Sequence, residues 1–149
     1  GFLALIGGVI LIFALFDNAI LRSFISGCAA ALLSYYINSK ALKDAGEKVI
    51  VYWAPILEEL LKTGFALVLK SKVLLTHATF GVVEAVYDIF TNDSITAYWA
   101  GAASLISHIV FGAITQYFIY RQNSFFGIAI AAFVHMAWNF AVIRIKNQH

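Results

Sequence analysis

Long apolar runs, separated only by short polar segments, fill almost the whole chain. Each run approaches the roughly 20 residues that an α-helix needs to cross a bilayer at about 1.5 Å of rise per residue. The pattern therefore predicts an all-α fold, a polytopic transmembrane helical bundle with about six spans. The expected spans are residues 1–16, 19–38, 50–70, 73–91, 97–120 and 125–145.

The connections between these runs are brief and leave no room for a separate soluble domain. They lie at residues 17–18, 39–48, 71–72, 91–94 and 121–124. We expect one integral-membrane domain over residues 1–149, with the first two spans joined by a tight hairpin at Asp17 and Asn18. The first run is short enough for a signal peptide. We favour a true first helix because no small-residue cleavage site precedes the hairpin, and a start without methionine is consistent with a missing N-terminal piece.

Composition agrees with a membrane protein, since 62% of the residues are hydrophobic and 12% are charged. The mean hydropathy of +0.85 is far above that of soluble domains. The single cysteine, Cys28, excludes an internal disulfide. Lysine and arginine divide almost evenly between the two sides, so the positive-inside rule predicts no orientation. The lipid bilayer is the expected environment, and no nucleic-acid partner is expected.

The most informative segment is Ala-Pro-Ile-Leu-Glu-Glu-Leu-Leu-Lys at residues 54–62, because it places three ionisable groups inside an apolar span. A charged residue at the centre of a membrane helix costs about 2.5–3.5 kcal/mol on insertion scales. Such residues are therefore paired, neutralised or kept for function. Pro55 leaves one backbone carbonyl without a partner and is expected to kink the helix, which makes room for water.

Other buried polar residues occur at a similar depth on neighbouring spans. Side B is defined as the side that carries residues 39–48, residues 91–94 and the C-terminus. Counted by helical rise, the polar layer lies roughly 9–15 Å from side B. Its members are Glu58, Glu59, Glu84, His108, His135 and Asn139. This agreement favours a shared polar pocket that opens toward side B. His77 fails the same test, because it falls near the opposite face.

Each of these positions also has a purely structural interpretation. Glu58 and Lys62 are four residues apart and could form an internal ion pair that merely makes insertion tolerable. A lone intramembrane histidine such as His108 is often a hydrogen-bonded packing residue. His135 and Asn139, four apart on one helical face, are more readily explained as acting together.

Carboxylates and histidines in a secluded polar layer suit the hydrolysis of an amide. A carboxylate can take a proton from water, while histidine or asparagine stabilises the developing oxyanion. Imidazole and carboxylate are also normal zinc ligands, and an open position on the metal would carry the attacking water. The compact His-Glu-x-x-His pattern of zinc proteases is absent. The spacing therefore predicts a hydrolytic or metal site without choosing between the two.

Four motifs in this order resemble the PrsW-type intramembrane proteases, which belong with the CAAX-prenyl-protease and bacteriocin-processing enzymes. They are Ala-Pro-x-x-Glu-Glu-x-x-Lys at 54–62, Phe80-x-x-x-Glu84, His108, and His135-x-x-x-Asn139. The resemblance covers about residues 50–143, and the first two spans carry no recognisable signature.

The resemblance implies an intramembrane endopeptidase that cleaves a membrane protein or peptide in or near the bilayer, in the cytoplasmic membrane of a prokaryote. Glu58 is the first choice for general base and Glu59 the second. The remaining site residues implied by the resemblance are Glu84, His108, His135 and Asn139. Prenyl-protease relatives have histidine where this chain has Glu84, which shifts the cluster toward a metal site. The expected zinc ligands are Glu84, His108, His135 and Glu59, with Lys62 neutralising one glutamate.

Rival functions remain. A proton-coupled transporter would also align carboxylates and histidines at one depth, but it needs a continuous polar path, and side A offers only His77. A haem-binding electron carrier could use His108 and His135 as axial ligands, although glutamates are unusual beside haem. A non-catalytic membrane scaffold would leave the four intact motifs unexplained.

Overall fold

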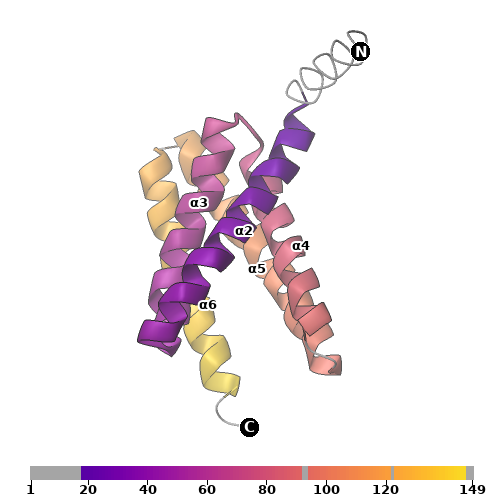
Figure 1. Cartoon of the computed structure of the whole chain (residues 1–149). Helices are drawn as coiled ribbons and strands as arrows, with labels where there is room; N and C mark the ends of the chain where they lie inside the picture. The colour runs from indigo at the N-terminus through magenta and orange to yellow at the C-terminus, as the bar shows by residue number, and fades with distance from the viewer. Residues whose placement is uncertain (1–17, 92–93, 122, 147–149) are drawn as a thin grey trace, which may run out of the picture.

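The computed structural model describes residues 18–91, 94–121 and 123–146, and within these every regular element is a helix (Figure 1). The expected first span at residues 1–16 and Asp17 lie outside the described residues. The elements are α2 (Ala19–Ala45), η1 (Val49–Trp53), α3 (Ala54–Val68), α4 (Val73–Thr91), α5 (Ile95–Arg121) and α6 (Ser124–Lys146). The all-helical prediction is confirmed for this part of the chain.

Four of the described helices are long and apolar enough to cross a membrane. They are α2, α4, α5 and the Ser124–Ile145 part of α6. The chain therefore has the helices of an integral membrane protein. The segment expected as a span at residues 50–70 is built differently, because a short π-helix, η1, precedes the 15-residue helix α3.

Helix α2 differs from the expectation at its C-terminal end. The prediction of a connection over residues 39–48 is wrong for its first part, because α2 continues to Ala45. The break comes at Gly46, whose φ of 63° lies in the left-handed region that glycine adopts without strain. At the other end, the side chain of Asn18 accepts hydrogen bonds from the N–H groups of Ile20 and Leu21, so α2 begins with an asparagine N-cap.

Pro55 shapes the junction between η1 and α3. The N–H of Ala54 donates to the carbonyl of Val49, an i to i+5 bond of π-helical type. By the same spacing the carbonyl of Ile50 would accept from residue 55, but proline has no N–H. Nδ2 of Asn139 on α6 donates to this carbonyl at 2.9 Å. The chain therefore forms a π-turn just before Pro55, and one side-chain amide of α6 binds its free carbonyl.

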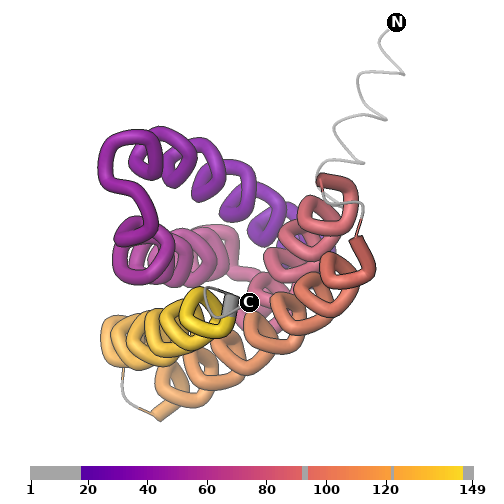
Figure 2. Tube along the Cα trace, turned by 90° about the horizontal axis from the view of Figure 1, so that it is seen from below, coloured from indigo at the N-terminus to yellow at the C-terminus, as the bar shows by residue number. Residues whose placement is uncertain are grey.

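The five long helices form a closed ring of contacts. α2 contacts α3 and α4, α3 also contacts α6, α6 contacts α5, and α5 contacts α4 along most of its length. Figure 2, seen along the bundle from the end nearest the C-terminus, shows this arrangement, with α3 between α2 and α6. Residues from every helix can therefore meet inside the ring.

Two glycines bring α4 and α5 close together. A Cβ atom added to Gly81 would lie 3.0 Å from Cβ of His108, and one added to Gly112 would lie 2.6 Å from Cβ of His77. Each histidine thus packs over a glycine of the facing antiparallel helix. Because α4 and α5 lie so close together, the imidazoles of His77 and His108 are buried inside the bundle.

The distribution of side chains is inverted relative to a soluble protein. Phe90, Ile95 and Phe125 are each at least 78% exposed, whereas Glu59 and Lys62 are fully buried. The apolar core cluster is small and centres on Ala30, Ala31 and Phe80. Large apolar side chains that face outward fit a lipid environment, and a charged interior at membrane depth marks a candidate functional site.

Candidate functional site: a buried cluster of carboxylates, histidines and lysine

The adjacent glutamates of α3 point to different neighbours, because consecutive positions on an α-helix diverge by about 100°. Glu58 turns toward α2, where Nδ2 of Asn38 donates to its Oε1 at 3.2 Å. Glu59 turns into the centre of the bundle and has no exposed surface. The two carboxylates therefore meet different partners although they share one turn of helix.

Glu59 is the hub of the cluster, and both of its oxygens are engaged. Oε1 accepts from Nζ of Lys62 at 2.6 Å and from Nδ1 of His135 at 3.0 Å. Oε2 lies 3.0 Å from Nε2 of His77. With partners from α3, α4 and α6, Glu59 compensates the buried ammonium and ties three helices together. The alternative ion pair between Glu58 and Lys62 is not the one formed.

Lys62 extends the network to α5. Its Nζ lies 3.0 Å from Nδ1 of His108, and Nε2 of His108 lies 2.6 Å from Oε2 of Glu84. An ammonium group can only donate, so Nδ1 of His108 accepts and Nε2 carries the proton that it donates to Glu84. Ser104 also donates to Oε2 of Glu84, at 2.5 Å. The tautomer of His108 is therefore set by its two neighbours.

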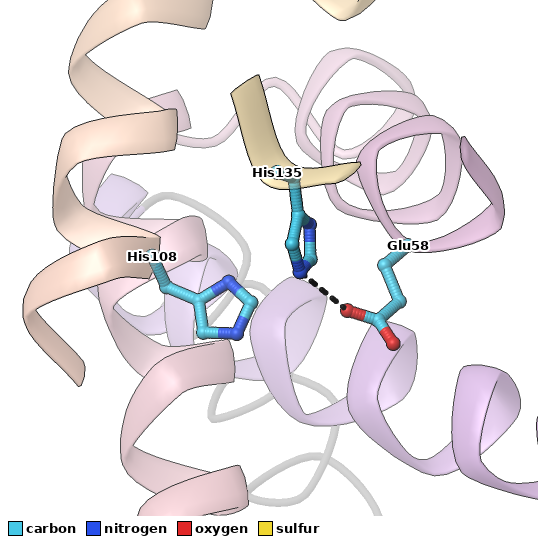
Figure 3. A group of neighbouring side chains, drawn as sticks. All are labelled: Glu58, His108 and His135. Atoms are coloured by element: carbon cyan, nitrogen blue, oxygen red, sulfur yellow. Dashed lines mark ion pairs between the residues drawn. The ribbon is translucent and has the colours of Figure 1, made fainter. Parts of the chain in front are cut away.

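Glu58 and His135 face each other without a direct hydrogen bond (Figure 3). Oε2 of Glu58 lies 3.8 Å from Nε2 of His135, beyond hydrogen-bonding distance. In its neutral form, a His135 ring that donates from Nδ1 to Glu59 presents a lone pair at Nε2. Oε2 of Glu58 is buried and has no hydrogen-bond partner among the described residues. Two electron-rich atoms thus converge on one point, which suits a proton donor or a cation.

A group of ligand atoms that could hold a metal ion lies at the same point. Glu58, His108 and His135 each offer one atom, and these atoms lie within 4.8 Å of one another. The donor chemistry, one carboxylate and two imidazoles, fits zinc. The expected ligand set shares His108 and His135 with this group. Glu59 and Glu84 instead hydrogen-bond Nδ1 of His135 and Nε2 of His108, respectively.

Asn139 is the one predicted site residue that lies apart from the cluster. Its amide donates to the carbonyl of Ile50 and is thereby committed to the π-turn. The spacing of His135 and Asn139 placed both on one face of α6, but that face passes from the cluster to η1 within one helical turn. The expected joint action of the two residues is not reflected in their contacts.

The sequence predicts His77 near the opposite face, but in the structure it lies fully buried in the cluster. The reason is the turn after α3, where the N–H of Ser71 donates to the carbonyl of Ala66 and returns the chain along the helix. Measured from this bond, Glu59 lies about 10 Å and His77 about 9 Å into the bundle. A helical-face argument would have found His77, because it precedes Glu84 by two turns on α4.

Comparison with known proteins found no matching family model, no matching curated protein and no matching solved structure. The chemical argument therefore depends on the cluster itself. Five helices contribute to it: Asn38 from α2, Glu58, Glu59 and Lys62 from α3, His77 and Glu84 from α4, His108 from α5 and His135 from α6. Within the described residues, the cluster holds one carboxylate oxygen of Glu58 without a hydrogen bond beside His135, whereas both oxygens of Glu59 and Oε2 of Glu84 are hydrogen-bonded.

Proposed function

We propose that the chain is an intramembrane peptidase that hydrolyses a peptide bond of a membrane protein or peptide in or near the bilayer. The observation that carries the proposal is the unpartnered Oε2 of Glu58 beside Nε2 of His135. A carboxylate that makes no competing hydrogen bond can accept a proton from water. The PrsW-like order of motifs supports the same reaction.

In this proposal Glu58 is the general base. Its Oε2 takes a proton from the attacking water, whose oxygen adds to the scissile carbonyl, and the same proton is later delivered to the leaving amine. His135 orients the water through its Nε2 lone pair, and Glu59 holds the ring by accepting from Nδ1 at 3.0 Å. The positive charge of Lys62 favours the negative charge that develops on the carbonyl oxygen. Asn139 has no catalytic role here, because its amide is bonded to Ile50.

Zinc is the proposed cofactor of a metal-dependent form of this site. Glu58, His108 and His135 would hold it. When bound, the ion supplies a Lewis acid that polarises a carbonyl and acidifies water. Glu84 and Glu59 would serve as the carboxylates behind the two histidines, the arrangement that fixes ring orientation in metal sites.

The test compares cells that express wild type, Glu58→Gln, His135→Ala and Glu47→Gln, with new protein N-termini identified by mass spectrometry. Glu47 is an exposed glutamate outside the cluster and serves as the matched control. New N-termini within apolar segments of membrane proteins are expected for wild type and Glu47→Gln only. Profiles of folded Glu58→Gln and His135→Ala that equal the wild-type profile would refute the proposal.

One observation favours proton-coupled transport as a second candidate. The hydrogen bonds from Ser104 through Glu84, His108, Lys62 and Glu59 to His77 form one connected path across the interior. His77 was expected to be the one buried polar residue near side A. It is instead hydrogen-bonded to Glu59 and so belongs to this path. Purified protein in vesicles that contain a pH-sensitive dye would collapse an imposed pH gradient if this candidate held, and His77→Gln would abolish the effect. An unchanged gradient excludes it.

A further inference from the structure

Both histidines of the possible metal group are prepared for ligation in the same way. His108 donates from Nε2 to Glu84 at 2.6 Å, and His135 donates from Nδ1 to Glu59 at 3.0 Å. In a neutral imidazole the nitrogen opposite the donor carries the lone pair. A carboxylate on one nitrogen and a lone pair on the other is the typical arrangement of histidines that bind metal. The inward lone pairs are Nδ1 of His108 and Nε2 of His135.

Among the residues that the structure describes, only one of these lone pairs lacks a competing donor. Nε2 of His135 faces Oε2 of Glu58, whereas Nδ1 of His108 accepts from Nζ of Lys62 at 3.0 Å. Lys62 has no exposed surface and also donates to Glu59. The ring of Phe80 lies beneath the ammonium, with its centroid 4.5 Å from Nζ. These contacts keep the ammonium of Lys62 within hydrogen-bonding distance of Nδ1 of His108.

We propose that Lys62 is a built-in competitor for the metal: its ammonium and a divalent cation exclude each other at Nδ1 of His108. One lone pair cannot serve both, and two positive centres repel strongly in an interior of low dielectric constant. The site formed by Glu58, His108 and His135 therefore takes up a divalent ion only when Lys62 withdraws from Nδ1 of His108. In the structure, the ammonium of Lys62 lies at the nitrogen of His108 that a metal would need.

The inference is tested by metal binding alone and does not depend on peptidase activity. Zn²⁺ binding to the detergent-purified chain is measured by elemental analysis after equilibrium dialysis, and Co²⁺ binding by visible absorption. Lys62→Met is expected to bind both ions roughly 10- to 100-fold more tightly than wild type, the change that corresponds to one charge-assisted hydrogen bond. Lys43→Met, which removes an exposed lysine, should bind as wild type does.

A further variant shows that the gain belongs to this site. Adding His108→Ala to Lys62→Met should abolish the tighter binding, because the lone pair freed by the first change is removed by the second. Equal affinity of wild type and Lys62→Met would overturn the proposal. So would a gain that persists without His108.

Lys62→Met leaves Glu59 without its cation, so it could fail to fold. The charge-balanced variant Glu59→Gln/Lys62→Met removes one charge of each sign and should bind the metal more tightly than Glu59→Gln does, since both lack the carboxylate behind His135. Wild type provides an independent arm through ¹⁵N spectra of its histidine rings. One equivalent of Zn²⁺ should leave the His108 nitrogens unchanged. A stoichiometric shift of Nδ1 of His108 would show that the metal binds despite Lys62 and would overturn the proposal.

Discussion

Glu58 and Glu59 are chemically identical neighbours on α3 and both lie beside His135, yet their hydrogen bonding differs. Glu59 is fully buried and both of its oxygens are bonded, to Lys62, His77 and His135. Glu58 has one oxygen bonded to Asn38 and one with no partner among the described residues. The step of about 100° between consecutive helical positions is enough to separate the two environments.

This difference in hydrogen bonding suggests different roles for the two carboxylates. A buried charge with three partners stabilises the fold chiefly by compensating another charge, and its removal leaves that charge unpaired. A buried carboxylate oxygen without a partner adds no stabilising hydrogen bond to the fold and remains open to a reacting group. We therefore expect substitutions at Glu59 to act on stability and substitutions at Glu58 to act on chemistry.

The largest effect is expected from Glu59→Gln. This change leaves the Lys62 ammonium inside the bundle without a carboxylate, which should lower the free energy of unfolding by about 3–5 kcal/mol. Reversible unfolding in mixed detergent micelles, followed by circular dichroism, measures the change. A loss below about 1 kcal/mol, the range of exposed ion pairs, would contradict the role given to Glu59.

Gly112→Ala tests whether the position of His77 beside Glu59 depends on close helix packing. The new Cβ would lie 2.6 Å from Cβ of His77, so α4 and α5 must separate. We expect a loss of about 1–3 kcal/mol in the free energy of unfolding, typical of overpacking. Gly64→Ala is the matched control, because nothing lies within 4 Å of its added Cβ. Equal stabilities of the two variants would contradict the packing argument.

Asn139→Ala tests whether Asn139 supports the π-turn or takes part in the reaction at Glu58 and His135. It removes the donor to the Ile50 carbonyl and should lower the free energy of unfolding by about 0.5–1.5 kcal/mol. Hydrogen exchange of the η1 amides should accelerate, while any Glu58-dependent cleavage persists. Cleavage lost with unchanged hydrogen exchange would return Asn139 to the catalytic set.

The smallest effect on stability is expected from Glu58→Gln. The amide oxygen keeps the contact with Asn38, and the new NH₂ group places a donor opposite Nε2 of His135. The free energy of unfolding should change by less than about 1 kcal/mol, the value of one neutral hydrogen bond. The same micellar titration measures it. A loss as large as that of Glu59→Gln would show that both glutamates are structural and would remove the contrast between them.

Depth along apolar helices was a good predictor of which residues meet. Glu58, Glu59, Glu84, His108 and His135 were expected at one level, and all five lie in the cluster. Helical rise is nearly constant, so sequence position converts to depth wherever a span starts at a known level. The boundaries of α4 were also predicted, because a mainly apolar run from Val73 to Thr91 lies between two short polar segments of the sequence.

Depth along the helices did not predict the positions of His77 and Asn139. In one case local structure shifts a helix, and in the other it draws a side chain away from the cluster. The turn bonded at Ala66 starts α4 deeper than its sequence position suggests, which brings His77 to Glu59. The π-turn at Pro55 exposes a carbonyl that recruits Asn139 away from the cluster.

The amino-acid sequence alone is sufficient for the apolar helices, their order and the presence of buried charge, because hydrophobicity and helical rise are local properties. The partners of each charge are decided by tertiary structure. The way in which five helices close into a ring decides which glutamate has both oxygens hydrogen-bonded. It also decides which histidine nitrogen carries a lone pair and where the Lys62 ammonium lies. Hydrogen bonds are short and directional, so shifts of a few ångströms between helices decide what each group can do.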